Sequence, residues 1–447
     1  MLVRLTVRSL LLLGILANAS GLSAQLPARP KSAARKESEA GSQPAKTAPT
    51  GRNDSRLASF DKLMSKFISE REIPGAALAV TRHGRLVYAR GFGFADVEQQ
   101  QPVQPDSLFR IASISKPITA VAILQLVEQG RLRLDDKVFS ILSVEPHLDD
   151  GTKPDPRLSD ITILHLLQHT AGWDRDKSFD PMFRPVKIAE TLSVAAPAQQ
   201  RHIIRFMAGQ PLDFDPGERY AYSNFGYCLL GRVIERVSGE AYDDYVRRSV
   251  LAPVGALRPR LGFTFPERRA EGEVRYYEAS MPTGKSVFAK NLGEPVPVQY
   301  GAWCLEAMDA HGGWVASAVD LVRFASAFDD AEKSPLLRAE TIRRMFQRPD
   351  GDAGKNADGV PKPFFYGCGW LVRPAGNGKI NTWHTGSLDG TSTLLVRRHD
   401  GLDWAILFNT RNNQRKEPPA GAIDGLLHQA ADAVREWPDY DLFTRFH

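Results

Sequence analysis

Apolar residues near the start of the chain follow two different spacings, the first typical of a helix and the second of strands. Six of them recur three and four positions apart, as on one face of a helix: Leu57, Phe60, Leu63, Met64, Phe67 and Ile68. Pro74 ends that pattern. The apolar runs at 76–81 and 86–90 then predict a β-hairpin that turns at His83-Gly84.

A second group of strand-like runs occurs late in the chain, and a helical pattern over 423–437 follows it. The stretch between the two groups of strands is mostly helical in pattern, for example at 118–129 and 226–237. Residues 258–300 are rich in Pro, Gly and Arg, so we expect loops there. The late strand-like runs are 366–372, 380–384, 392–397 and 404–408.

Strands near both ends of the chain therefore flank a helix-rich middle. The simplest fold class for this order is an α/β (α+β) sandwich. It has one antiparallel sheet built from both ends of the chain, and helices from those ends pack on the sheet. An all-helical lobe lies beside the sheet, and we expect a functional site where the two meet.

The first residues look like a secretory signal peptide. Arg4 and Arg8 precede an apolar run at 10–17, and small residues follow, so cleavage is expected after Ala19 or Ala24. The run is too short for a membrane-spanning helix, although an uncleaved anchor is the alternative. We therefore expect an exported protein, periplasmic or extracellular, without stable membrane insertion after cleavage. The predicted organisation is a signal peptide over 1–24, a disordered cationic linker over 25–56 and a single domain over 57–437.

Charge argues against one class of partner, and the cysteine spacing argues against a metal site. The 447-residue chain has a net charge of +5, but residues 1–56 hold nine Lys/Arg against three acids, which leaves the remainder close to neutral. This balance argues against a nucleic-acid partner. Cys228, Cys304 and Cys368 form no C-x-x-C pair and no metal-binding spacing, so we expect buried thiols, with a single disulfide bridge as the alternative.

The most informative residues for chemistry are Ser113 and Lys116. Pro117 is tolerated only in a first helical turn, so it places a helix start close to Ser113. Residues three apart share a helix face, so the lysine can meet the serine hydroxyl. A serine needs such a base to act as a nucleophile, and the helix start offers its own N–H to an oxyanion. S-x-x-K alone is a weak signal, and the alternative without catalysis is a serine that caps the helix beside a surface lysine.

Two further motifs support that interpretation. Tyr222-Ser223-Asn224 precedes a predicted helix, where a tyrosine near a lysine can relay a proton and an asparagine can bind a substrate amide. The structural alternative is a tyrosine packed in the core and an asparagine that caps the helix. The second motif ends a strand-like run, where a strand edge can pair with an extended substrate and a glycine permits close approach: Trp383-His384-Thr385-Gly386-Ser387.

Taken together, these motifs resemble the penicillin-binding-protein and serine β-lactamase family. Tyr222 stands where the S-D-N motif of class A has its first serine, so the chain resembles the class C branch, which includes D-alanyl-D-alanine carboxypeptidases and related esterases. The resemblance covers about residues 57–437. The residues that carry it, in order and spacing, are Ser113-Ile114-Ser115-Lys116, Tyr222-Ser223-Asn224 and His384-Thr385-Gly386.

The resemblance implies a serine hydrolase that works through an acyl-enzyme and needs no metal or other cofactor. Ser113 is the implied nucleophile, and Lys116 and Tyr222 transfer its proton. The implied substrates are small molecules or peptides, namely esters, amides, β-lactams or D-amino-acid peptides. The remaining implied roles are substrate binding by Asn224, His384, Thr385 and Gly386, and an oxyanion hole formed by the N–H groups of Ser113 and Ser387.

His384 departs from the lysine of many β-lactamases. Its unperturbed pKa of about 6.5 leaves little charge at pH 7, so we expect weak β-lactam hydrolysis and better activity on short-chain esters. The turnover of anionic substrates should then rise relative to that of neutral esters as the pH falls from about 8 to 6.

A true β-lactamase with cephalosporinase activity and a non-catalytic penicillin-binding module are the alternatives. A classical α/β-hydrolase is disfavoured because the chain has no G-x-S-x-G. His169 could be a second base, but a structural role at a helix end is favoured.

Overall fold

The computed structural model describes residues 47–356, 358–412 and 417–446. The predicted signal peptide over 1–24, and the predicted linker up to residue 46, lie outside the described residues. Residues 47–56, which were assigned to that linker, are hydrogen-bonded to the sheet. The Thr50 N–H donates to the Gly91 carbonyl at 2.9 Å, and Arg90 donates to the carbonyls of Pro49 and Thr50. The folded body therefore begins before the predicted boundary at residue 57.

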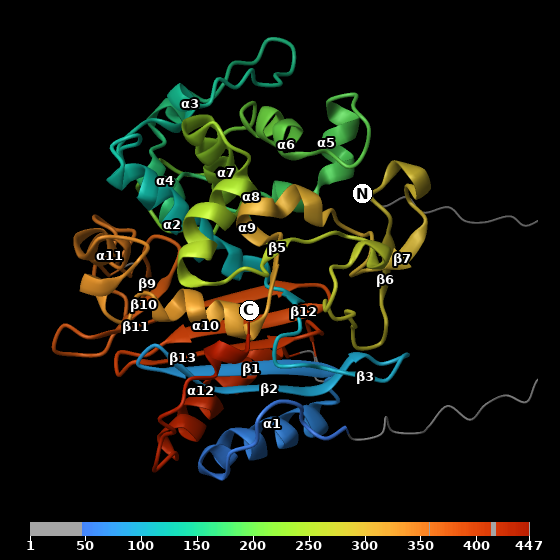
Figure 1. The fold of residues 1–447 in the computed structure, drawn as a ribbon. Helices are drawn as coiled ribbons and strands as arrows, with labels where there is room; N and C mark the ends of the chain where they lie inside the picture. The colour runs from blue at the N-terminus through green and yellow to red at the C-terminus, as the bar shows by residue number, and fades with distance from the viewer. Residues whose placement is uncertain (1–46, 357, 413–416, 447) are drawn as a thin grey trace, which may run out of the picture. The chain divides into compact units, whose positions relative to one another are not determined.

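The centre of the fold is an eight-stranded antiparallel sheet in the order β3-β2-β1-β13-β12-β11-β10-β9 (Figure 1). Strand β1 pairs with β2 on one side and with β13 on the other, so the sheet is built from both ends of the chain, as predicted. The strands are β1 (Gly75–Arg82), β2 (Arg85–Asp96), β3 (Gln101–Pro102), β9 (Phe365–Tyr366), β10 (Leu371–Pro374), β11 (Ile380–Leu388), β12 (Thr391–Arg397) and β13 (Leu402–Phe408).

One predicted strand is wrong. The run 366–372 is two strands, β9 and β10, which pair with each other across a tight turn. Gly369 takes a left-handed backbone angle, φ +83°, and the Gly367 N–H donates to the Trp370 carbonyl at 2.8 Å. Only glycine adopts such angles without strain, so Gly369 reverses the chain inside an apolar run that looks continuous in sequence.

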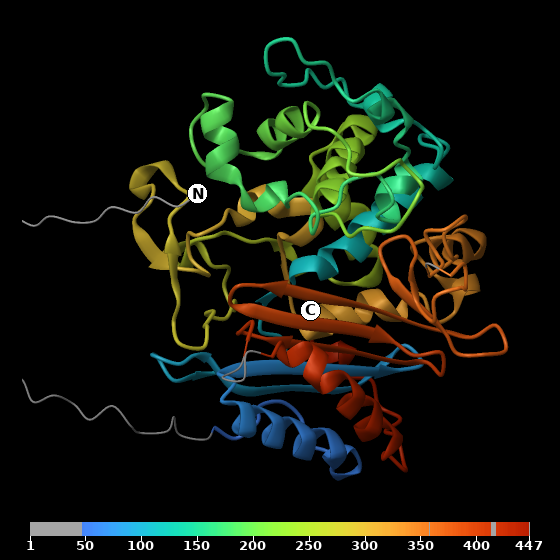
Figure 2. The ribbon, with the colours of Figure 1, turned by 180° about the vertical axis from the view of Figure 1, so that it is seen from behind.

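Helices cover both faces of the sheet. On one face, α1 (Ala58–Arg71) and α12 (Pro419–Asp432) lie side by side, as Figures 1 and 2 show. Their apolar residues pack with Trp404 and Ile406 of β13 in one core. The helix predicted over 423–437 thus starts four residues earlier and ends five earlier. On the other face, α10 (Ala318–Ser326) separates the sheet from a lobe of helices.

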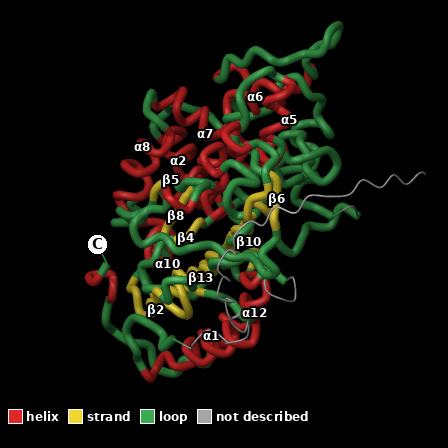
Figure 3. Tube along the Cα trace, turned by 90° about the vertical axis from the view of Figure 1, so that its right-hand side faces the viewer, coloured by secondary structure: helices red, strands yellow, loops and turns green. Residues whose placement is uncertain are grey.

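The helical lobe is organised around α2 (Ser115–Glu128), whose residues from Ser115 to Leu126 are all buried. Such a helix is apolar on every side because other elements enclose it, and α7 (Asn224–Ser238) packs against it. Figure 3 shows this lobe as the helix-rich layer beside the strands. No helix within the described ranges is long and apolar enough to cross a membrane. The other helices are α3 (Val138–Ile141), α4 (Ile163–Leu167), α5 (Pro185–Thr191), α6 (Gln200–Met207), α8 (Tyr242–Val246), α9 (Asp309–Gly312) and α11 (Ala339–Met345).

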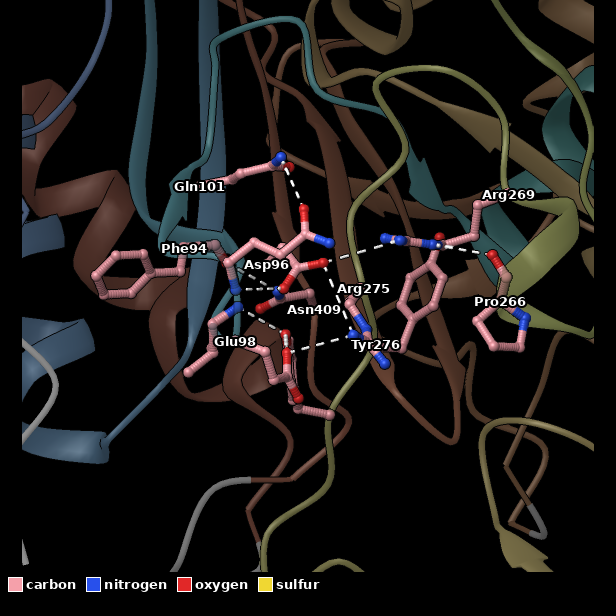
Figure 4. A network of polar contacts seen from close by, with 12 residues as sticks. Phe94, Asp96, Glu98, Gln101, Pro266, Arg269, Arg275, Tyr276 and Asn409 are labelled. Atoms are coloured by element: carbon pink, nitrogen blue, oxygen red, sulfur yellow. Dashed lines mark hydrogen bonds and ion pairs between the residues drawn. The ribbon is translucent and has the colours of Figure 1, made fainter.

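The expected loop region, 258–300, is mostly irregular and contains short strands. Figure 4 shows how polar contacts fix it to the end of β2. The buried Asp96 carboxylate lies 3.8 Å from a guanidinium nitrogen of Arg269 and of Arg275, and Arg275 also lies 3.7 Å from Glu98. Two further small sheets complete the fold, from β4 (Phe109–Arg110), β5 (Arg260–Leu261) and β8 (Trp314–Ala316), and from β6 (Thr283–Lys285) and β7 (Pro295–Pro297).

Arg110 ties the same region to the segment that precedes Ser113. Its fully buried guanidinium donates to the carbonyls of Gln299, Phe263 and Thr264, and it lies 4.2 Å from the ring centroid of Tyr276. These bonds give acceptors to both terminal nitrogens of a charge that would be costly to bury without partners.

All three cysteines are free and buried, so the alternative of a disulfide bridge is wrong. Burial raises the pKa of each thiol, Cys228, Cys304 and Cys368, to about 12. These residues therefore act as small apolar groups in the core.

Candidate active site

Ser113 lies in a single 3₁₀ turn, Ala112–Ile114, directly before α2. Ala112 has φ +48°, an angle that costs energy for any residue with a Cβ. Pro117 occupies the first turn of α2, where its missing N–H costs nothing. The strained turn and the proline together fix the half-buried Ser113 at the junction of the sheet and the helical lobe.

Lys116 is fully buried and its amine points at the serine. Its Nζ atom lies 3.1 Å from Ser113 Oγ, 2.8 Å from Asn224 Oδ1 and 2.9 Å from the His311 carbonyl oxygen. Burial lowers the pKa of Lys116 well below its usual value, and the nearby charge of Arg175 lowers it further, whereas Asp180 opposes the shift.

Burial favours the neutral form of the Lys116 amine, and the three hydrogen-bond partners of Nζ can accommodate that form. A neutral amine has two N–H donors, which the oxygens of Asn224 and His311 accept. Its lone pair then faces Ser113 Oγ and can receive the hydroxyl proton. Lys116 is therefore placed as a general base.

Tyr222 approaches the same hydroxyl from the residue before the α7 cap. Its OH donates to Ser113 Oγ at 2.8 Å, and the Ser223 side chain caps α7 by accepting from the Gly226 N–H. Burial raises the pKa of Tyr222 above its usual value of 10. A phenol that keeps its proton can donate it to a leaving group. The structure thus brings together Ser113, Lys116 and Tyr222, as predicted.

Asn224 is held by protein groups on both sides of its amide. Its Oδ1 accepts from Lys116, and its Nδ2 donates to Asp180 Oδ2 at 2.6 Å. The amide that was expected to hold substrate therefore connects the lysine with an acid that the sequence analysis missed. Burial raises the pKa of Asp180. The only local signal for Asp180 is its place before Pro181, which is typical of a helix cap.

The expected titration of His384 between pH 8 and 6 is wrong, whereas its expected role in substrate binding stays a prediction. The side chain is buried, with Nδ1 2.7 Å from the Thr385 carbonyl and Nε2 3.0 Å from the Tyr366 hydroxyl. Burial, with help from Lys116, lowers the pKa of His384 to about 3. The imidazole is therefore neutral from pH 8 to 6, and it offers no charge to an anionic substrate.

The rest of the motif lies on β11 beside Ser113. Gly386 faces the 3₁₀ turn so closely that an added Cβ would overlap the Ile111 carbonyl and the Thr393 hydroxyl and lie 3.2 Å from the Ala112 Cβ. Thr385 and Ser387 are exposed. The oxyanion role of the Ser113 and Ser387 N–H groups stays a prediction.

The predicted strand edge exists only in the second half of β11. Strand β10 pairs with Ile380 to Trp383 and goes no further. Among the strands that the structure describes, His384 to Leu388 pair with β12 alone. The free side of this half-strand is the place where an extended substrate can add main-chain hydrogen bonds.

His169 follows the end of α4 with φ +58° and packs between two tyrosines. The imidazole centroid lies 4.4 Å from that of Tyr222 and 4.4 Å from that of Tyr366, and Nδ1 accepts from the Ser223 N–H at 3.2 Å. Burial lowers the pKa of His169 well below its usual value. The residue therefore supports Tyr222 through packing, in line with the structural role favoured from sequence.

Comparisons with known proteins agree with this geometry. A family model described as Beta-lactamase matches residues 60–427. The chain is 30% identical over 373 residues to esterase EstB of Burkholderia gladioli, which covers 80% of this chain and 91% of EstB. It is 27% identical over 380 residues to penicillin-binding protein 4* of Bacillus subtilis strain 168, over 84% of this chain and 75% of that protein. The solved octameric penicillin-binding protein homologue from Pyrococcus abyssi superposes with a TM-score of 0.61 and 25% identity, over 84% of this chain and 77% of that one.

Proposed function

This chain is a serine hydrolase that belongs to the beta-lactamase family, and we propose that it cleaves carboxylic esters through an acyl-enzyme on Ser113. The observation that carries the proposal is the position of the Ser113 hydroxyl, 3.1 Å from the Lys116 amine and 2.8 Å from the Tyr222 hydroxyl. A base and an acid on one nucleophile are what acyl transfer needs.

In the acylation step, the neutral Lys116 amine accepts the Ser113 proton while Oγ attacks the ester carbonyl. The carbonyl π electrons move to oxygen, and we expect the N–H groups of Ser113 and Ser387 to stabilise that oxyanion. When the tetrahedral intermediate collapses, the Tyr222 hydroxyl donates its proton to the departing alkoxide. The lysine then returns a proton to the tyrosine.

In the deacylation step, water takes the place of the alcohol. Lys116 or Tyr222 accepts a proton from the water as it attacks the acyl carbonyl, and Ser113 leaves with a proton from the same pair. The reaction releases a carboxylic acid and restores the free hydroxyl.

Esters are proposed ahead of amides, D-amino-acid peptides and β-lactams for two reasons. An alkoxide leaves more readily than an amide anion, and the 30%-identical relative EstB is named as an esterase. In addition, the position at which many β-lactamases carry a lysine holds the neutral, buried His384, so this position provides no cation for the carboxylate of β-lactams and peptide C-termini.

Covalent labelling tests the proposal. A fluorophosphonate probe should label the wild-type protein once, and Ser113→Ala should remove that label. Ser387→Ala is the matched control, because it deletes a hydroxyl in the same site but keeps the N–H expected in the oxyanion hole. Persistent labelling of folded Ser113→Ala, or no turnover of phenyl esters by the wild type, would refute the proposed function.

We also propose that the protein is exported, on the basis of Arg4, Arg8 and the apolar run 10–17. The mature protein should then lack residues 1–19 or 1–24 and occur outside the cytoplasm. Mass spectrometry of the N-terminus after cell fractionation tests this. An intact Met1 in cytoplasmic protein contradicts the proposal.

A further inference from the structure

Among the described residues around Ser113, the site offers two candidate cations, because the other basic groups are neutralised. Lys116 is fully buried with a lowered pKa, and His384 is neutral with both ring nitrogens engaged. Lys362 lies over a tyrosine that does not contact Ser113 Oγ, with Nζ 5.9 Å from the ring centroid of Tyr220. Arg175 lies directly on the catalytic tyrosine, with its guanidinium carbon 4.7 Å from the centroid of the Tyr222 ring.

The guanidinium of Arg175 is available to a ligand. Its side chain is 41% exposed, and its closest acid is Asp176, itself 91% exposed, at 3.8 Å from Nε. Within the described part of the chain, no hydrogen bond from this guanidinium occurs. Arg219 and Arg157 differ, since Arg219 donates to Asp174 and Arg157 donates to Asp155. Arg175 thus presents a planar set of N–H donors that matches a carboxylate.

The backbone that carries Arg175 is held in place. Asp174 makes three hydrogen bonds in this turn. Its carboxylate accepts from Arg219 and from the Asp176 N–H, and its own N–H donates to the Asp213 carboxylate at 2.8 Å. Fixing the backbone reduces the entropy that the side chain loses when it binds a ligand. The side chain can therefore act as a directed contact beside Tyr222.

The charge of Arg175 also reaches the reacting groups. Burial is the largest cause of the pKa shift of Lys116, His169 and Tyr222. The charge of Arg175 adds to the lowering of the pKa of Lys116 and His169, and it opposes the raised pKa of Tyr222. The field of this cation therefore extends over the space where the substrate must lie.

We propose that Arg175 determines substrate specificity by binding a carboxylate on the substrate. The proposal deepens the proposed function and rests on it. The shared chemistry is a carboxylate on the acyl chain or on the leaving alcohol, and the two sources are separated by experiment.

The test uses three phenyl esters whose hydrolysis releases a measurable phenol. Phenyl hexanoate is neutral, phenyl hydrogen adipate carries a carboxylate on the acyl chain, and 3-carboxyphenyl hexanoate carries it on the leaving group. Arg175→Gln should lower kcat/KM for one of the two anionic esters by about tenfold or more, the size expected when a charge-assisted hydrogen bond is lost. Phenyl hexanoate should change by less than about threefold, because burial, which the variant keeps, is the larger cause of the pKa shifts of Lys116 and Tyr222.

Two further variants sharpen the result. Arg175→Glu should lower the same kcat/KM beyond Arg175→Gln, since like charges repel, and Arg175→Lys should restore only part of it. Lys177→Gln is the matched control, because it removes the same charge two residues away, from an exposed side chain whose hydrogen-bond partner among the described residues is the Asp213 carbonyl. An equal loss in Lys177→Gln would show general attraction of anions and overturn the proposal.

A binding measurement separates this proposal from the chemistry of Ser113. Calorimetry with Ser113→Ala should detect weaker binding of whichever anionic ester depends on Arg175 when Arg175→Gln is added, whether or not the wild type turns over esters. Equal affinity for the anionic ester with and without Arg175, or equal losses on all three esters, would refute the role of Arg175. Absent turnover with intact Arg175-dependent binding would refute the proposed function alone.

Discussion

The contact between Gly386 and the turn that carries Ser113 gives the sharpest prediction. An added Cβ at Gly386 would overlap the Ile111 carbonyl and the Thr393 hydroxyl, which are themselves hydrogen-bonded at 3.0 Å. Backbone forms part of this contact, so it cannot move aside as a flexible side chain can. We therefore expect Gly386→Ala to separate β11 from the 3₁₀ turn by roughly 1 Å, the retreat that restores van der Waals spacing.

The cost follows from two terms. Overpacking a well-packed interior costs about 1–3 kcal/mol, and weakening the buried bond from Thr393 to Ile111 adds about 1 kcal/mol. For a body of this size, that loss lowers Tm by about 2–5 °C. The effect on turnover should be larger, because a 1 Å misplacement of reacting groups costs about 10²-fold.

The assay compares kcat/KM on phenyl hexanoate with the melting temperature of the same preparation. Gly425→Ala is the matched control, because Gly425 lies on α12 with nothing within 4 Å of the added Cβ. That variant should keep full activity and gain slightly in stability, since alanine favours a helix interior. Full activity in Gly386→Ala would refute the idea that this contact positions Ser113.

Further predictions concern the proton. Lys116→Met and Tyr222→Phe should each lower kcat/KM on phenyl esters by about 10²–10⁴-fold, and the double variant should lose little more, because both residues serve one transfer; fully additive losses would argue for separate roles. The wild-type rate should rise with pH through the lowered pKa of Lys116, because the base must be neutral, and hold until Tyr222 ionises above its usual pKa of 10, as a profile from pH 5 to 11 can check. His384→Gln should leave the shape of that profile unchanged between pH 5 and 8, since the pKa of His384 is about 3, and a lost transition there would contradict a neutral imidazole. Asp180→Asn should move the acidic limb to lower pH, because it removes the anion that raises the pKa of Lys116, and a move to higher pH would contradict this.

Local patterns predicted the fold well where local physics decides it. The helix at α1 follows from apolar spacing, and the turn at His83-Gly84 from two residues that tolerate positive φ, 49° and 73°. The single strand over 366–372 failed because the run is apolar on both sides of Gly369, whose turn depends on its contact with α2. Periodicity cannot detect a reversal that keeps both arms buried.

In the site too, local sequence predicts some features, whereas contacts between distant residues decide the others. Ser113 and Lys116 are three residues apart, so helix geometry alone brings them together. Asp180 was missed because it meets Asn224 across 44 residues of chain, without any local pattern. The charge of His384 was misjudged because its burial depends on Tyr366, a residue on another strand. Tertiary environment decides a pKa, and a motif does not report it.

The pairing of β1 with β13 has a consequence for the order of folding. Thr81 and Asp403 share a hydrogen bond, although 322 residues separate them. During synthesis the hairpin of β1 and β2 leaves the ribosome long before its central partner exists, so an apolar strand edge waits unpaired. High contact order of this kind slows folding. Ending translation before Leu402 should therefore yield an aggregation-prone chain, even though Ser113, Lys116 and Tyr222 are all present in it.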